Sequence, residues 1–152
     1  MSIALIGGKD ETIIAERVFE KVQRKHCVIS LLGVLSLREL PLLLQIAVLF
    51  IGNNSGPKHL AASLGTPTIG IHSGVVDATE WGPFGERALA VRRKTVCSPC
   101  YVASASDCYR GLACLWKLRP SDVFDVCKTI IGYYDVSDNL RSNKVSITGT
   151  TN

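Results

Sequence analysis

The chain has 152 residues, of which 47% are hydrophobic and 20% are charged. This length suits one domain with a hydrophobic core, and the composition excludes a chain that is disordered over most of its length. The 17 basic residues outnumber the 13 acidic ones and give a formal net charge of +4. Because these charges are dispersed, they favour an anionic partner but do not distinguish phosphates from nucleic acid or a membrane surface.

The N-terminal residues 1–8 have no basic segment, and their apolar run is too short for a signal peptide. The most apolar stretch, residues 40–51, is interrupted by Pro41 and Gln45. It is also shorter than the about 20 apolar residues that a membrane helix requires. We therefore expect no transmembrane segment and a cytoplasmic location.

Apolar runs and turn residues predict alternating strands and helices in the first part of the chain. Strands are expected at residues 2–6 and 27–32, because each is a short apolar run closed by glycine. The predicted helix between them has an apolar face made of Ile13, Ile14, Val18 and Val22. Ser36 and Glu39 form a capping box for a second helix, which Pro41 should keep short or bent.

The same alternation continues in the second part of the chain. Further strands are predicted at residues 47–51, 68–72 and 87–92, with a helix through Leu64 after the first of them. The order of elements predicts an α/β fold in which helices cover a parallel sheet. A final helix is expected at about residues 123–131, followed after Asp135 by a disordered tail rich in Ser, Thr and Asn.

Residues 53–59 lie where a predicted parallel strand passes into a helix, at the edge where open α/β sheets bind ligands. Asn54 or Ser55 can cap this helix, and Gly56 lets a ligand approach the backbone. Unpaired N–H groups and the helix dipole favour a diphosphate at such a turn. The alternative is that the segment is only a well-formed helix start.

The two residues that follow Pro57 can strengthen an anion site at this turn. Lys58 would add positive charge, and His59 would add a hydrogen bond to the same diphosphate. Both are therefore candidate ligand-binding residues.

A cysteine-rich insert occupies residues 97–114. A Cys-x2-Cys pair is followed by two more thiols, which together can close a tetrahedral site for Zn²⁺ or Fe. The candidate ligands are Cys97, Cys100, Cys108 and Cys114. Because cytosolic thiols stay reduced, a structural metal is favoured over free thiols and over disulfides.

Several segments resemble glycosyltransferase family nine, the ADP-heptose:lipopolysaccharide heptosyltransferases. They are Ile-Gly-Gly-Lys-Asp-Glu at 6–11, Leu-Gly-Val-Leu-Ser-Leu-Arg-Glu-Leu at 32–40, the turn and helix at 53–68, and Asp-Ala-Thr-Glu-Trp-Gly-Pro at 77–83. They occur in the family's order and spacing, and the likeness covers roughly residues 3–126.

The resemblance implies the C-terminal half of a GT-B fold, a Rossmann-like parallel sheet with helices on both faces. Residues 1–135 would form the donor-binding domain, truncated at its N-terminus and including the cysteine insert, with 136–152 as the disordered tail. Some family members carry a similar four-cysteine finger that binds iron and supports assembly, which makes a homo-oligomer a further expectation. A cytoplasmic protein of this kind would be at most peripheral to the inner membrane.

The resemblance also implies roles for individual residues in a donor pocket. Glu11 would bind ribose hydroxyls, and Leu35 would border the adenine. The diphosphate and sugar would be held by Ser55, Gly56 and His59, with Asp77 and Trp81 at the rim of the pocket. Asn54 and Lys58 of the same turn and helix are further donor-binding candidates. Without the family, Glu11 is an acid favoured by the helix dipole, and Trp81 is a half-buried packing residue.

Two positions depart from the family pattern. Asn54 stands where an Asp is usual, and Lys58 stands where an apolar residue is commoner. Asn54 can still cap a helix but supplies no carboxylate. Replacing a negative charge and adding a positive one favours binding of a diphosphate, even where turnover suffers.

The implied function is the donor-binding portion of an enzyme that transfers a heptose or similar sugar from a nucleotide-sugar, such as ADP-heptose. The acceptor, a lipopolysaccharide-type glycan or a protein, would bind an absent N-terminal domain that also holds the catalytic carboxylate. No residue is a good candidate for the base, because His59 is on the donor side and His26 and His72 are ordinary structural residues. We expect the isolated chain to bind a nucleotide weakly or not at all and to transfer no sugar.

Two other functions compete with this one. The cysteine insert and Arg92-Arg93-Lys94 would suit a nucleic-acid-binding module, but the insert contains only one Arg and no Lys, so no nucleic-acid partner is expected. The second alternative is a non-catalytic assembly domain that oligomerises through a metal finger.

Overall fold

The computed structural model describes residues 2–142 of the chain. It consists of two compact units, Met1–Leu43 and Leu44–Asn152, where the sequence predicted one domain over residues 1–135. Residues 143–152 of the expected disordered tail lie outside the described residues. Residues 136–142 of that tail were predicted wrongly, because they continue the last helix, α6 (Pro120–Ser142).

The first unit contains two short parallel strands, β1 (Ile3–Leu5) and β2 (Val28–Ser30), paired with Ile3 opposite Val28. Both strands lie inside the predicted ranges. The connection between them contains the 3-10 turns Lys9–Glu11 and Lys25–Cys27 and the helix α1 (Thr12–Lys21).

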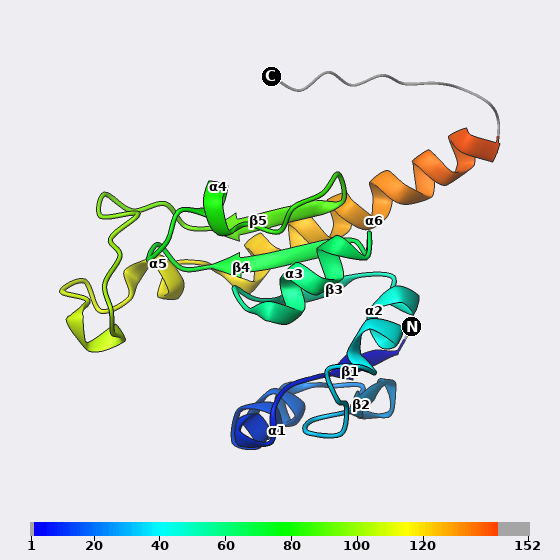
Figure 1. Ribbon diagram of the computed structural model, residues 1–152, viewed down its shortest axis with the longest axis horizontal. Coiled ribbons are helices and arrows are strands. Elements are labelled where there is room, and N and C mark those ends of the chain that lie inside the picture. Colours follow the sequence, from blue (N-terminus) through cyan, green and yellow to red (C-terminus); the bar gives the residue numbers. More distant parts are fainter. Residues whose placement is uncertain (1, 143–152) are drawn as a thin grey trace. The chain divides into compact units, whose positions relative to one another are not determined.

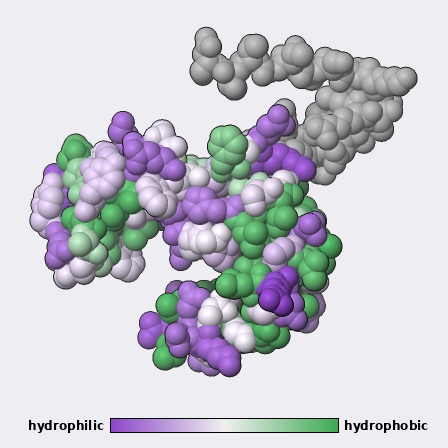
Figure 2. Space-filling model, viewed as in Figure 1, coloured by the Kyte–Doolittle hydropathy of each residue, from purple (hydrophilic) through white to green (hydrophobic). Residues whose placement is uncertain are grey.

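Helix α1 forms where the apolar periodicity predicts it, but its apolar side chains are not buried. Ile13, Ile14 and Val18 are all exposed, and no residue of α1 is buried. A sheet of two three-residue strands offers little surface to cover a helix, and Ile3 and Ile29 of that sheet are themselves exposed. Figure 2 shows hydrophobic residues at the surface of the chain.

Helix α2 (Leu40–Ile46) is short, as Pro41 predicts. The predicted capping box before it forms only in part: Glu39 Oε2 accepts hydrogen bonds from the backbone N–H of Ser36 at 2.9 Å and from its hydroxyl at 2.7 Å, while the N–H of Glu39 bonds to the carbonyl of Ser36 and not to its hydroxyl. The two bonds to Oε2 lower the pKa of Glu39, because they stabilise its carboxylate form.

The second unit contains a parallel three-stranded sheet in the order β3 (Phe50–Asn53), β4 (Thr68–His72), β5 (Ala88–Arg92). The predicted strands therefore form two sheets rather than one. The helices of this unit are α3 (Gly56–Ser63), α4 (Ala78–Trp81), α5 (Ala113–Trp116) and α6, and a 3-10 turn lies at Ala105–Asp107.

Helices cover both faces of the three-stranded sheet, in agreement with the predicted α/β fold. Helix α6 runs along one face of the sheet (Figure 1). There Ile69 of β4 and Val91 of β5 pack against Cys127 and Ile130 of α6. Alternate residues of a strand point to opposite faces, so Gly70 and His72 belong to the other face. That face is covered by α3, whose Ala61 and Ala62 are buried there with Lys58.

None of the helices within residues 2–142 has both the length and the apolar character needed to span a bilayer.

Candidate nucleotide-binding site

The turn between β3 and α3 exposes the start of a helix at the carboxyl edge of the sheet. Ser55 occupies the N-cap position in an extended conformation, with φ −149° and ψ 170°. Its side chain makes no capping hydrogen bond, and its hydroxyl instead donates to the carbonyl of Asn53 at 3.3 Å. Ser55 thus leaves the backbone N–H of Gly56 without a side-chain cap, and Asn54 does not supply one, because its Oδ1 is bonded to Lys58.

Gly56 forms the most open point of this turn. A Cβ atom built on Gly56 would meet no atom within 4 Å. Pro57 follows and has no N–H, while the backbone N–H of Lys58 bonds to the carbonyl of Ser55 at 3.2 Å. The backbone at Gly56 is therefore accessible at the positive end of the helix dipole, as an anion site requires.

Lys58 does not face this open point, contrary to the sequence prediction. Its side chain is 0% exposed, and its Nζ lies 2.5 Å from Asn54 Oδ1 and 3.1 Å from His72 Nε2. Nζ also donates to the backbone carbonyl of Trp81. Burial lowers the pKa of Lys58. A lysine enclosed in this way cannot contact a diphosphate directly.

His72 is part of the same buried group, which the sequence analysis did not predict. Its ring is 0% exposed, and its pKa is lowered to about 4 by burial and then by the positive charges of Lys58, His59 and Arg92. The imidazole is therefore neutral at pH 7. An ammonium group only donates, so Nε2 accepts from Lys58 and the proton lies on Nδ1. This Nδ1 is buried without a hydrogen-bond partner among the described residues.

Gly70 makes room for this group. A Cβ at Gly70 would lie 2.7 Å from Lys58 Cδ and 3.0 Å from His72 Nε2, too close for either contact. A glycine between two isoleucines of a strand is a sign of such a close approach, and it was the one signal in the sequence for this group.

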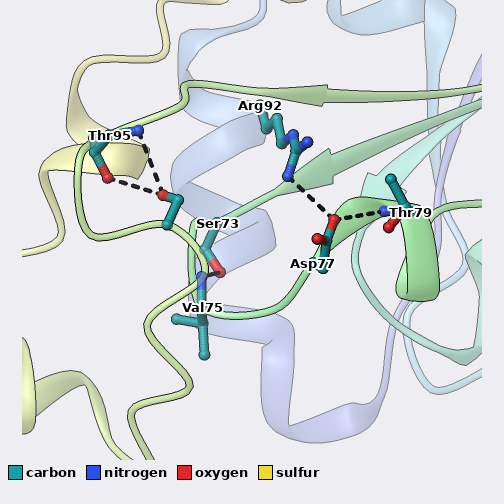
Figure 3. Close-up of polar contacts among 7 residues, drawn as sticks. Ser73, Val75, Asp77, Thr79, Arg92 and Thr95 are labelled. Atoms are coloured by element: carbon teal, nitrogen blue, oxygen red, sulfur yellow. Dashed lines mark hydrogen bonds and ion pairs between the residues drawn. The ribbon is translucent and has the colours of Figure 1, made fainter.

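Asp77 caps the N-terminus of α4 and forms an ion pair with Arg92 of β5. Figure 3 shows its carboxylate between the backbone N–H of Thr79, at 2.9 Å, and the guanidinium of Arg92, at 3.6 Å. The hydrogen bonds to Thr79 are the main cause that lowers the pKa of Asp77, and Arg92 adds to them. Asp77 thus fixes the segment that leads to Trp81, while Trp81 itself keeps a half-exposed side chain.

The other candidate donor-binding residues lie on different elements. His59 is exposed on α3, and its pKa is lowered by burial and by Lys58. Glu11 and Leu35 belong to the first unit. Glu11 is exposed and accepts a hydrogen bond from the backbone of Gly8 at 2.7 Å, while Leu35 is half-buried.

The predicted four-cysteine metal site is not assembled in the structure. Within residues 2–142, no three side chains of His, Cys, Asp or Glu form a group that could hold a metal ion. Cys97 Sγ lies 3.3 Å from the Thr95 hydroxyl, Cys108 Sγ accepts from the N–H of Leu112 at 3.3 Å, and Cys114 is buried on α5.

A parallel α/β sheet with an open strand-to-helix turn at its carboxyl edge has the arrangement at which open α/β folds commonly bind anionic ligands. The family model of glycosyltransferase family 9 (heptosyltransferase) matches residues 1–109. The chain belongs to this family.

Two solved structures have a similar fold. ADP-heptose LPS heptosyltransferase II of E. coli is 17% identical with a TM-score of 0.69, and the match covers 88% of this chain and 37% of that one. The family 9 glycosyl transferase of Veillonella parvula is 21% identical with a TM-score of 0.68, covering 86% and 36%. The chain thus spans little more than a third of either structure. No curated protein matches it.

Proposed function

We propose that the chain is the part of a glycosyltransferase that binds the nucleotide-sugar donor, with ADP-heptose or a similar sugar nucleotide as its ligand. Membership of the heptosyltransferase family supports the class of ligand. The observation that carries the proposal is the uncapped start of α3, where the backbone of Gly56 is open to a diphosphate.

In this proposal the turn holds the two phosphates. The N–H of Gly56 donates to a phosphate oxygen, and the Ser55 hydroxyl and the exposed His59 ring add further hydrogen bonds.

Sugar transfer needs a base within hydrogen-bond reach of the acceptor hydroxyl. His72 is neutral but buried against Lys58, so it cannot reach an acceptor. We infer that another domain supplies the base and binds the acceptor, a lipopolysaccharide-type glycan or a protein. The chain by itself then binds the donor weakly and transfers no sugar.

Titration of the ¹⁵N-labelled chain with ADP and ADP-heptose to millimolar concentration tests this proposal. The backbone amide of Gly56 should shift with both ligands and stay in place with adenosine, which lacks phosphates. An assay for released ADP, with lipopolysaccharide core as acceptor, should show no turnover. Unshifted Gly56 with every ligand would refute donor binding, and turnover by this chain alone would refute the need for another domain.

A further inference from the structure

The buried Lys58 joins three separate segments at the candidate site. Its Nζ contacts Asn54 in the turn before α3, His72 at the end of β4 and the carbonyl of Trp81 at the end of α4. An ammonium group has three N–H donors, and these three partners are all acceptors. The cation also satisfies a C-terminal carbonyl of α4, which has no partner within its helix.

The contact with Asn54 determines which way its amide group faces. Because the ammonium only donates, the atom of Asn54 at 2.5 Å from it must be the carbonyl oxygen. The amide nitrogen Nδ2 is then the branch directed away from Lys58. Asn54 is itself exposed, and no residue within 2–142 bonds to Nδ2. Two N–H donors are therefore available beside the open backbone of Gly56.

We propose that Lys58 is a positioning residue that turns Asn54 so that its Nδ2 donates to the diphosphate of the nucleotide-sugar. This inference rests on the proposed function and assigns separate roles to Lys58 and Asn54 in the same site. Lys58 acts through Asn54, because an ammonium that is 0% exposed cannot touch the ligand. A carboxylate at position 54 would offer no donor and would repel the diphosphate.

Gly70 of β4 leaves room for the Lys58 side chain in this arrangement. The absence of a Cβ there lets the aliphatic part of Lys58 cross β4 and reach Trp81. Asn54 and Lys58, four residues apart, thus form one unit with Gly70 of β4 at the carboxyl edge of the sheet.

A double-mutant cycle with the full chain tests the inference, with ADP as the probe. Lys58→Met should keep the fold, because an apolar side chain of similar length replaces a buried charge. It should weaken ADP binding about tenfold, as loss of one hydrogen bond to a charged group does. Asn54→Ala should weaken binding by a similar factor, and the double variant should be no weaker than either single one.

The matched control is Lys128→Met, which removes the same charge from an exposed ion pair with Asp125. It should leave ADP binding unchanged. If the losses from Lys58→Met and Asn54→Ala multiply in the double variant, Lys58 acts on the ligand through its charge alone and the inference is overturned.

NMR spectra of the ¹⁵N-labelled wild-type chain test the role of Asn54 independently, even where Lys58→Met fails to fold. The Nδ2 protons of Asn54 should shift with ADP and not with adenosine. A shift at Gly56 without one at Asn54 would overturn this inference and leave the proposed function standing. No shift at either residue would overturn both.

Discussion

Nζ of Lys58 lies 3.1 Å from Nε2 of His72, and both side chains are 0% exposed. Two basic groups can be this close because the imidazole stays neutral and accepts a hydrogen bond from the ammonium. The same contact, together with burial and the charges of His59 and Arg92, keeps the pKa of His72 at about 4. Protonation of His72 would place a second positive charge beside the first.

This relationship predicts how stability depends on pH. The pKa of His72 is about 4 in the folded chain and 6.5 as a model value for the unfolded one. Between these values the unfolded chain binds a proton that the folded chain does not. The contribution of neutral His72 to the free energy of unfolding is therefore fully present above pH 6.5. It is lost as the pH falls toward 4, by up to about 3 kcal/mol.

Urea unfolding at pH values from 4.5 to 7.5 measures this dependence. His72→Gln, which still offers an acceptor to Lys58, should flatten the curve of unfolding free energy against pH. His59→Gln changes an exposed histidine on α3 and should flatten the curve less. Parallel curves for wild type and His72→Gln would contradict the prediction.

Gly70→Ala should destabilise the chain by about 1 to 3 kcal/mol, because the new methyl group meets Lys58 Cδ. Lys58→Ala removes that atom, so the double variant should be less destabilised than the sum of the two single changes. Chemical unfolding of the four proteins gives the coupling energy. Strict additivity would show that the Lys58 chain does not cross β4 at this glycine.

Gly56→Ala should separate ligand binding from stability. The added methyl group meets no protein atom within 4 Å, so the change should be neutral or stabilising by less than about 1 kcal/mol. A diphosphate lying against the backbone would clash with it, and ADP binding should weaken about tenfold, or about 1.4 kcal/mol. Gly132→Ala, on α6 and equally free of neighbours, is the matched control and should leave ADP binding unchanged. Equal ADP affinity for both variants would place the ligand elsewhere.

Ile130→Ala should destabilise the chain by about 2 to 5 kcal/mol, because Ile130 is 5% exposed in the core between α6 and the sheet. Phe124→Ala, on the same helix but with a side chain 62% exposed, should cost less than about 1 kcal/mol. Thermal unfolding of the two variants measures the difference. Similar losses would mean that α6 packs on the sheet through another face.

Local patterns were enough to predict most of the elements. One half of the capping box forms, since Glu39 accepts from the backbone N–H of Ser36, and the turn at Ser55 and Gly56 begins a helix where the residue types require one. Both depend on residues within one turn of chain. The helix at residues 12–21 was equally predictable, but the burial of its apolar face was not, because burial depends on what surface lies opposite.

The surroundings of Lys58 lay outside any local pattern. Near the start of a helix and two residues after a glycine, a lysine is typical of an anion site, and the sequence analysis placed Lys58 there. Its partners His72 and Trp81 are 14 and 23 residues away along the chain, so nothing in the spacing indicates them. For the cysteines, the sequence spacing predicted a metal site, but no such group of side chains is assembled among the described residues.

The amino-acid sequence by itself determined the α/β alternation, the open helix start at Gly56 and the family, because these follow from short-range periodicity, turn chemistry and ordered motifs. Only the tertiary structure decided that Lys58 points inward to Asn54, His72 and Trp81 and not outward to a ligand. The physical reason is that the direction of a long, flexible side chain depends on the acceptors around it. Those acceptors come together only when β4 and α4 are in place beside α3.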